Sequence, residues 1–481
     1  MSTLDDILKD APRARLIPTF AEPRKEQRTV SVLLATLSAV PSFARQLLAC
    51  CEVRMGKTSE LHSYTEVEFA SPDTDRKDRP DGILRLLTRK TQWSALIEAK
   101  IDKVEIDEEQ IQRYAVIARN HGIDAVITIS NQLVPLPNHL PYAVPRRFSQ
   151  RVKFFHISWI SVLTQALLVL RDQRELSDEQ AFILEEMTHY LEHPGSGVKR
   201  FDQMNSEWRS LCLGVRQDEP FRRSSPEIEN TVTSWDQEVR DLCLMLSRRM
   251  DESVEIRISR KHQADPELRF KDTCDSLCES QELRCAFIVP NAASDIEITV
   301  NLERRTVACS MWLSAPGHKK RASAKINWLV RQLRNVADKD VILRVYWGRR
   351  GTTQATMSEI REDATCLEIG SQGALPSGFE LIMIRSLGGR FTGRRTFIED
   401  LENLVPEFYD QIGQNLRPWT PPPPSIDKHD PIEHEEAVDT DQKLDSGDAL
   451  KPASNLLSAM QKPNSPSLES VAIDKPSEST S

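Results

Sequence analysis

Two short apolar runs, separated by only two residues, constrain the fold of this chain more than any other feature. They cover residues 83–90 and 93–101, and so short a connection predicts a β-hairpin. In the second run apolar residues alternate in position, so that one face is continuously apolar and the other becomes charged at Glu98 and Lys100. These two side chains are therefore expected to point the same way from one strand end.

The expected hairpin also predicts which residues face each other. A turn centred near Lys90 and Thr91 pairs residues whose numbers sum to about 181. Asp81 would then lie beside Lys100, and Ile83 beside Glu98. Three chemically distinct groups are expected to converge at one end of the hairpin.

A helix is well signalled after the hairpin. Asp107 can act as its N-cap with Gln110 at the third helical position, and Gly122 follows the last periodic residue. Gln110 and Tyr114 are four residues apart and share a face of this helix.

The neighbouring segments complete a mixed sheet covered by helices. Apolar spacing predicts helices over 26–52, interrupted at Pro41, and over 159–171. Strands are expected at 64–69, 123–130 and 153–158. Beyond 226 we expect an α+β unit with a helix at 235–250, strands at 285–289, 296–302, 306–313, 341–347 and 379–385, and helices at 322–336 and 396–415.

At 481 residues the chain exceeds one ordinary domain of about 150 residues. The predicted organisation is a flexible arm (1–25), a first domain (26–172), a helical connector (173–225), the α+β domain of unknown role (226–416) and a disordered tail (417–481). The tail is rich in Pro, Ser, Asp and Glu, and such a composition cannot bury enough apolar surface to offset its ordering entropy.

Charge is unevenly distributed along the chain. Of the net charge of −9, residues 420–481 contribute −7 (12 Asp/Glu against 5 Lys). Residues 316–395 carry +8 (15 Lys/Arg against 7 Asp/Glu), so an acidic chain still contains a basic region suited to nucleic acid.

The nine cysteines are an odd number, and no signal-peptide pattern opens the chain, so we expect a cytoplasmic protein with reduced thiols. Cys274, Cys278 and Cys285 form the one cluster to weigh as a metal site. Their spacing is unlike a zinc knuckle, which favours unpaired structural thiols. No apolar run approaches the ~20 residues of a membrane span, so no membrane contact is expected.

The order Pro80-Asp81-Gly82, then Glu98-Ala99-Lys100, then Gln110 and Tyr114 resembles the PD-(D/E)xK nuclease superfamily, and Gln-x3-Tyr is similar to its RecB-like branch. The resemblance covers residues 26–170. It implies a restriction-endonuclease-like fold, a mixed α/β sheet flanked by helices, and divalent-metal-dependent hydrolysis of phosphodiesters. For Gln110 and Tyr114 it implies a role in holding the substrate or the lysine.

The chemistry of the residues fits this resemblance. Attack of water on a charged phosphodiester needs a Lewis acid, and Mg²⁺ or Mn²⁺ prefers a few carboxylate and carbonyl oxygens. Asp81, Glu98 and the carbonyl of Ala99 would supply metal ligands. Lys100 would orient the attacking water or help to deprotonate it.

Superfamily members often add an acidic residue from the first helix, and the resemblance carries this role to Glu26, with Glu66 and Glu68 as competitors. The sequence Arg79-Pro80-Asp81-Gly82 differs from the Gly-x-x-Asp motif of RecB-like nucleases. The cysteine arrangement of the iron–sulfur members is not evident either, so the superfamily is retained without the branch.

Three basic runs in the second unit are candidates for tracking a phosphate backbone. They are 318–321, 349–350 and 390–395, with Trp347 or Phe391 available to stack on bases. The alternative is a set of solvated loops.

The leading hypothesis is a metal-dependent deoxyribonuclease whose C-terminal domain binds DNA or a partner. The competing hypothesis is a catalytically inactive protein that keeps the nuclease fold for binding or regulation in a genome-defence or mobile-element system. Action on RNA is a third. The sequence leaves open endo- or exonuclease action, a homodimer, and a protein partner bound through the C-terminal domain or tail.

Overall fold

A computed structural model of the chain describes residues 24–70, 77–89, 91–172, 175–217, 222–334, 341–368 and 373–420. The described residues belong to one compact unit. Most of the predicted arm and nearly all of the predicted tail lie outside them. The fold is mixed α/β with two main sheets, and the domain boundaries at 172 and 225 stay predictions.

The first sheet has five strands in the order β1-β4-β5-β6-β7. Its first three strands are antiparallel, whereas β5, β6 and β7 are parallel. The strands are β1 (Glu60–Thr65), β4 (Gly82–Leu87), β5 (Gln92–Ala99), β6 (Ala125–Ser130) and β7 (Lys153–Ser158). A separate two-stranded ribbon joins β2 (Phe69–Ala70) and β3 (Lys77–Asp78).

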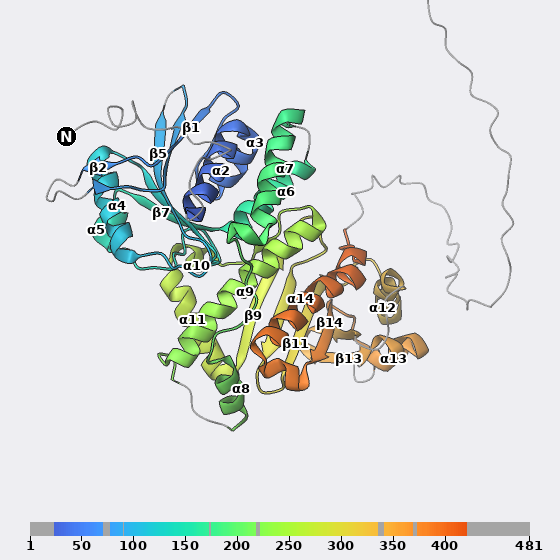
Figure 1. Cartoon of the computed structure of the whole chain (residues 1–481). Helices are drawn as coiled ribbons and strands as arrows, with labels where there is room; N and C mark the ends of the chain where they lie inside the picture. The colour runs from blue at the N-terminus through green and yellow to red at the C-terminus, as the bar shows by residue number, and fades with distance from the viewer. Residues whose placement is uncertain are drawn as a thin grey trace, which may run out of the picture. The chain divides into compact units, whose positions relative to one another are not determined.

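Helices cover both faces of this sheet (Figure 1). On one face lie α4 (Glu108–His121) and α5 (Arg146–Ser149). On the other lie α2 (Lys25–Ala39), α3 (Pro41–Ala49), α6 (Trp159–Arg171) and α7 (Asp178–Glu192). Because both faces are covered, all the residues of β6 are buried, as expected of a strand inside a parallel sheet.

The caps predicted from the sequence are present. The side chain of Asp107 accepts a hydrogen bond from the backbone N–H of Glu109, and Gly122 ends α4 at φ 67°. Pro41 begins α3, so the predicted interruption is confirmed, and α2 and α3 meet at a bend of 110°. In the described residues no single helix is long and apolar enough to cross a membrane, although this bent pair passes on length and composition when its two helices are taken together.

Two predictions about the strands are wrong. The strand expected at 64–69 ends at Thr65, because Glu66 adopts a left-handed φ of 58°. The hairpin pairs Gly82 with Ile97 and Leu87 with Gln92, so facing residue numbers sum to 179 rather than 181. Ile83 therefore faces Leu96, not Glu98. Asp81 lies just before β4, and the same register extended by one residue places it opposite Glu98 rather than Lys100.

The second sheet has seven antiparallel strands in the order β13-β12-β14-β11-β10-β9-β8. They are β8 (Glu255–Ile256), β9 (Glu282–Ile288), β10 (Ile296–Asn301), β11 (Thr306–Ser314), β12 (Val341–Tyr346), β13 (Thr352–Thr356) and β14 (Gly378–Ser386). Figure 1 shows α14 lying across β11 and β14.

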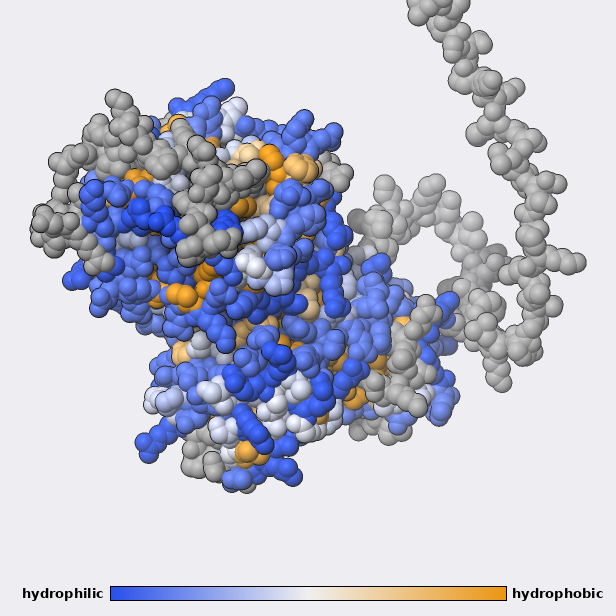
Figure 2. Space-filling view, in the orientation of Figure 1, coloured by the Kyte–Doolittle hydropathy of each residue, from blue (hydrophilic) through white to orange (hydrophobic). Residues whose placement is uncertain are grey.

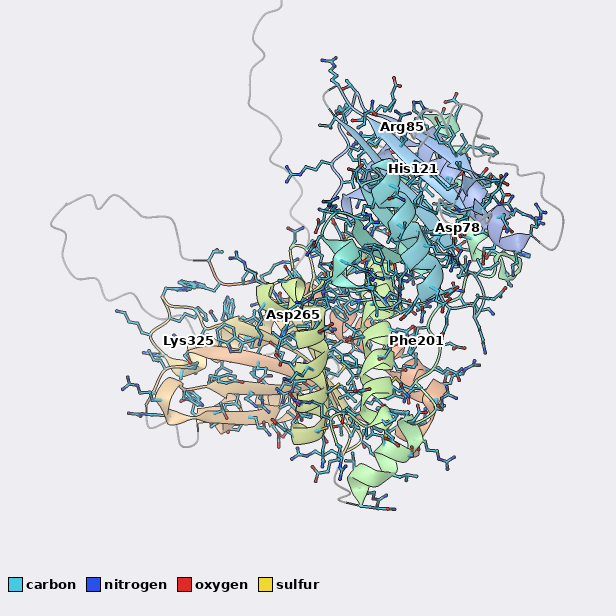
Figure 3. All side chains as sticks on the ribbon, turned by 90° about the vertical axis from the view of Figure 1, so that its left-hand side faces the viewer. Asp78, Arg85, His121, Phe201, Asp265 and Lys325 are labelled. Carbon is cyan, nitrogen blue, oxygen red and sulfur yellow. The ribbon has the colours of Figure 1, made fainter. Side chains whose placement is uncertain are left out.

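The helices of this part are α8 (Trp208–Arg216), α9 (Pro226–Met250), α10 (Arg260–Ala264), α11 (Pro266–Ser280), α12 (Ala322–Val330), α13 (Met357–Glu362) and α14 (Arg394–Gln411). Short 3-10 turns lie at Pro194–Ser196, Arg331–Leu333, Gly348–Arg350, Ala364–Glu368, Gly388–Thr392 and Gly413–Asn415. Phe201, labelled in Figure 3, packs against the cores of both sheets. In the view of Figure 2 the described surface is mostly hydrophilic, with apolar residues in small patches.

The longest helix, α9, carries a fully buried acid. Both side-chain oxygens of Glu238 lack a hydrogen-bond partner among the described residues. Burial raises the pKa of Glu238 well above its usual range, and the nearby Asp241 adds to this rise. Asp241 itself accepts a hydrogen bond from the guanidinium of Arg200 at 3.3 Å.

We expect Glu238→Gln to stabilise the fold at neutral and higher pH. A carboxyl with a raised folded-state pKa stays protonated in the folded chain where the unfolded chain has lost its proton, so stability falls as pH rises through that window. The glutamine removes this loss, and the melting temperature should rise by roughly 2 °C or more at about pH 8, with little change at about pH 4. Thermal unfolding against pH measures this, with the exposed Glu229→Gln on the same helix as control. Parallel profiles for the two variants would contradict the protonated state.

Candidate active site

The candidate site lies at the end of β5, on the face of the sheet that α4 covers. Glu98 and Lys100 leave the strand on the same side, and their side chains meet at 2.6 Å between Nζ and Oε1. The prediction that they point the same way is confirmed. Asp81 enters from the loop before β4, and its Oδ2 accepts a hydrogen bond from the backbone N–H of Ala99 at 2.8 Å.

The first helix contributes a third acid to this group. Glu26 lies in the first turn of α2, and its Oε1 is 3.1 Å from the Nζ of Lys100. The two competing acids lie elsewhere. Glu66 forms an ion pair with Arg79 at 2.7 Å, and Glu68 forms one with Lys77 at 2.7 Å.

Gly82 allows α2 to come this close. A Cβ added to Gly82 would lie 2.3 Å from the Cδ1 of Leu34, which sits on α2. Since real Cβ atoms do not approach other atoms so closely, a larger residue would force the Leu34 side chain to move. The glycine of Pro80-Asp81-Gly82 therefore allows α2 to pack closely on β4.

Gln110 and Tyr114 brace the loop that carries Asp81. The side-chain amide of Gln110 donates to the Tyr114 hydroxyl at 2.8 Å, and that hydroxyl donates to the backbone carbonyl of Arg79 at 3.2 Å. The Tyr114 side chain is buried on the sheet face of α4. The structure thus connects both residues to the Asp81 loop, and the Tyr114 hydroxyl also lies close enough to Glu98, the partner of Lys100, to lower the pKa of that acid.

The electrostatics of the site are dominated by burial. Burial raises the pKa of Asp81 well above its usual range, and repulsion from Glu98 adds to the rise. Burial also raises the pKa of Glu98, although the Lys100 ammonium opposes this change. For Lys100 burial by itself lowers the pKa, but the surrounding carboxylates outweigh it and the net shift is upward. Lys100 is therefore held in its charged form.

The donor set suits a hard divalent cation in charge and in chemistry. Three carboxylates surround one ammonium, so the fully ionised group has a formal charge of −2. Glu98 Oε2 is buried with no hydrogen-bond partner among the described residues. Such an atom and an excess of desolvated negative charge are what Mg²⁺ or Mn²⁺ would satisfy.

The side chains are nevertheless gathered around the lysine. Within the described part of the chain, no group of three or more His, Cys, Asp or Glu residues is placed so as to hold a metal ion. Glu98 Oε1 is occupied by Lys100, and Asp81 Oδ2 by the Ala99 N–H. A cation would take the remaining oxygens, Asp81 Oδ1 and Glu98 Oε2, with the Ala99 carbonyl as the further predicted ligand.

Sequence reasoning missed two supports of this site. The indole N–H of Trp159 donates to the backbone carbonyl of Lys100 at 2.9 Å and fixes the strand end. Asp102 forms ion pairs with Lys25 at 3.3 Å and with Lys199 at 3.1 Å. These contacts join residues distant in sequence, and no local pattern signals them.

Stacking by Trp347 or Phe391 is contradicted by burial. Their side chains are 3% and 0% exposed, so neither ring can meet a base. The run 390–395 is also structural. Arg390 pairs with Asp400, and Arg395 with Asp202. The guanidinium of Arg394 donates to the Met204 carbonyl.

The cysteines form no cluster of ligands. All nine are free thiols, as predicted, and burial raises the pKa of both Cys274 and Cys278. Raised thiol pKa values disfavour the thiolate form that binds metals.

Comparison with family models finds no match for this sequence, and comparisons with curated proteins and with solved structures find none either.

Proposed function

We propose that this protein is a divalent-metal-dependent deoxyribonuclease with a restriction-endonuclease-like catalytic domain, and that it works in the cytoplasm. The observation that carries the proposal is the convergence of Asp81, Glu98 and Lys100 at the end of β5, with Glu26 added from α2. These residues come from three separate elements, so local sequence alone does not explain their meeting.

The arrangement of elements supports the same proposal. A hairpin delivers Asp81 and Glu98 to the middle of a mixed sheet, and the parallel strands β6 and β7 continue it. Carboxyl ends of parallel strands are where functional groups gather in α/β sheets, because loops leave the sheet there. Helices close both faces, so the acids are desolvated on the side where a substrate phosphate would approach.

The residues of the chain can be given roles in phosphodiester hydrolysis. When bound, Mg²⁺ or Mn²⁺ supplies Lewis-acid stabilisation and a lower pKa for the attacking water. Asp81 and Glu98 would hold the cation through their free oxygens. Lys100 remains an ammonium because its pKa is raised, which supports orientation of water and stabilisation of phosphate charge over a role as general base.

Glu26 and Tyr114 act through other residues in this proposal. Glu26 contacts the lysine head group that Glu98 also contacts, and so helps to fix it. Tyr114, itself positioned by Gln110, holds the main chain at Arg79 and so fixes the approach of Asp81. Both are positioning residues, whereas Asp81, Glu98 and Lys100 would contact the cation, the water or the phosphate.

A second function is favoured by one observation. Asp81 and Glu98 each use one oxygen for a contact within the protein. The described residues contain no group of three or more His, Cys, Asp or Glu placed to bind a metal ion. A protein that keeps the nuclease fold for binding or regulation would show this feature permanently. Metal binding separates the two functions directly.

We expect Asp81→Asn, Glu98→Gln and Lys100→Ala each to reduce DNA cleavage at least ~100-fold, because each removes a group that meets the reacting atoms. Cleavage of plasmid, linear duplex, single-stranded DNA and RNA with Mg²⁺ or Mn²⁺ measures this and separates DNA from RNA, and ends from interior sites. Glu52→Gln and Lys153→Ala are matched controls, since this exposed ion pair lies where β7 begins, at the other end of the parallel strands from the site. If all three site variants cut like the wild type, the proposed active site is wrong.

We also expect Asp81→Asn to remove the effect of added metal on the stability of the fold. The raised pKa of Asp81 means that, without metal, stability falls as pH rises from the unfolded-state pKa through the folded-state pKa. In EDTA at about pH 8 the variant should therefore melt roughly 2–4 °C above the wild type, and at about pH 4 the two should agree.

Added millimolar Mg²⁺ or Mn²⁺ should raise the melting temperature of the wild type and of Glu52→Gln, but not that of Asp81→Asn, because only ligand bound by the folded state stabilises it. Differential scanning calorimetry with isothermal titration measures both effects. Wild-type protein that shows no saturable metal binding would favour the binding or regulatory function.

A further inference from the structure

The second sheet has one face that its helices do not cover. Residues on the inward face of the central strands are fully buried, as Met311 and Leu381 show, and the core contains only this face. On the outward face exposure is mixed, since Ile382 beside Leu381 is only 5% exposed. Trp312 is 45% exposed and Ile384 is 40% exposed. The face is therefore a broad surface built from strands β12, β14 and β11.

The indole of Trp312 covers a glycine on this face. A Cβ added to Gly378 would lie 2.4 Å from a ring atom of Trp312, so the indole occupies the space that a side chain would fill. Gly378 begins β14 and pairs with Ser314 and Tyr346 on the two flanking strands. The glycine therefore makes room for the ring of Trp312, a residue that stays 45% exposed.

Planar polar groups surround the indole. Glu380 faces Trp312 on one side and Arg344 on the other. Its carboxylate accepts hydrogen bonds from Arg344 at 2.9 Å and from the Tyr346 hydroxyl at 2.7 Å. The negative charge of Glu380, the residue that faces Trp312, is thereby paired with Arg344.

Basic loops lie at the end of the sheet nearest Trp312. Strands β11 and β12 both pair antiparallel with β14, so they run in the same direction and end at the same edge. The segment after β11 carries His318, Lys319 and Lys320, and the turn after β12 carries Arg349. Lys320 and Arg349 are exposed. Both exposed cations therefore follow strands that end at the same end of the sheet as Trp312.

We propose that this outward face binds single-stranded nucleic acid, with a base stacked on Trp312 and the backbone phosphates near Lys320 and Arg349. An exposed aromatic ring on a sheet can stack on any base, and cations at the same end of the sheet attract phosphates, which together favour a single strand over a duplex whose bases are already stacked. The centre of the face is apolar at Ile382 and Ile342, so the choice of a nucleic acid over a protein partner rests on the exposed cations Lys320 and Arg349.

This binding does not rest on the proposed nuclease activity. It involves another sheet and needs no metal, so it can be measured in EDTA, where cleavage is excluded. If both proposals hold, the second sheet would retain a strand while the first cuts it. Loss of one function would leave the other measurable.

The test is binding of fluorescent oligo-dT and oligo-U of about 15 nucleotides to the full chain in EDTA, by anisotropy at several salt concentrations. Trp312→Ala and Trp312→Leu should each weaken binding roughly tenfold, and Trp312→Phe should retain most of it, because only the phenylalanine preserves a ring face. The double variant Lys320→Ala with Arg349→Ala should weaken binding and flatten its salt dependence. Phe182→Ala, which removes an aromatic side chain 61% exposed on α7, is the matched control and should bind like the wild type.

Circular dichroism melting identifies any variant that fails to fold, and Trp312→Leu keeps apolar packing over Gly378 if the alanine does not. Equal affinity of Trp312→Leu and wild type would overturn the proposal. So would the absence of wild-type binding, or duplex binding as tight as single-strand binding. Tenfold losses confined to the Trp312 and basic variants would support it.

Discussion

The ammonium of Lys100 holds together carboxylates that would otherwise repel one another. Glu98 is almost fully buried, and both it and Asp81 have raised pKa values because burial disfavours their charged forms. One lysine between Glu98 and Glu26 offsets part of this cost, and a buried charge left without its partner is strongly destabilising. The position of α2 is tied to this interaction, since Glu26 lies in its first turn and Gly82 allows its close approach.

In the proposed function this cluster binds a cation, and its charge balance differs from that of a structural ion network. A network built for stability balances its charges, whereas this group keeps an excess of acid and an unpaired oxygen on Glu98. Neighbouring contacts keep the acidic side chains from moving apart. Asp81 is fixed by the Ala99 N–H, and its loop by Tyr114, so the acids cannot turn toward solvent. Buried acids with shifted pKa values are expected where a protein holds charge ready for a ligand.

Much of this region was predictable from local patterns, and the failures have physical causes. The segments 153–158 and 159–171 and the caps at Asp107 and Gly122 follow from periodicity and capping chemistry, which act within a few residues. The predicted sum of facing residue numbers was too high by two. The backbone N–H of Thr88 donates to the carbonyl of Thr91, and this hydrogen bond closes the loop earlier than predicted. Apolar spacing does not encode that choice of loop.

The site required more than local pattern. The sequence predicted that Asp81, Glu98 and Lys100 would meet, and the resemblance preferred Glu26 to Glu66. Local pattern gives no physical reason for that preference, because the position of Glu26 depends on how α2 packs on β4. In the second sheet Trp347 and Trp312 look equally suited to stacking until the covered face is known. Alternation along a strand gives two faces, and tertiary packing decides which becomes the core.

The two sheets are linked through consecutive residues beside the site. Lys199 pairs with Asp102, two residues beyond Lys100, and Arg200 reaches Asp241 on α9 and Glu402 on α14. Because neighbouring residues in a chain cannot move independently, the end of β5 is anchored to helices that pack on the second sheet. In the proposals above, a nucleic-acid strand bound by the second sheet would therefore contact a framework that also holds Lys100. The connection runs through Asp102 and the segment 199–200 to the same helices.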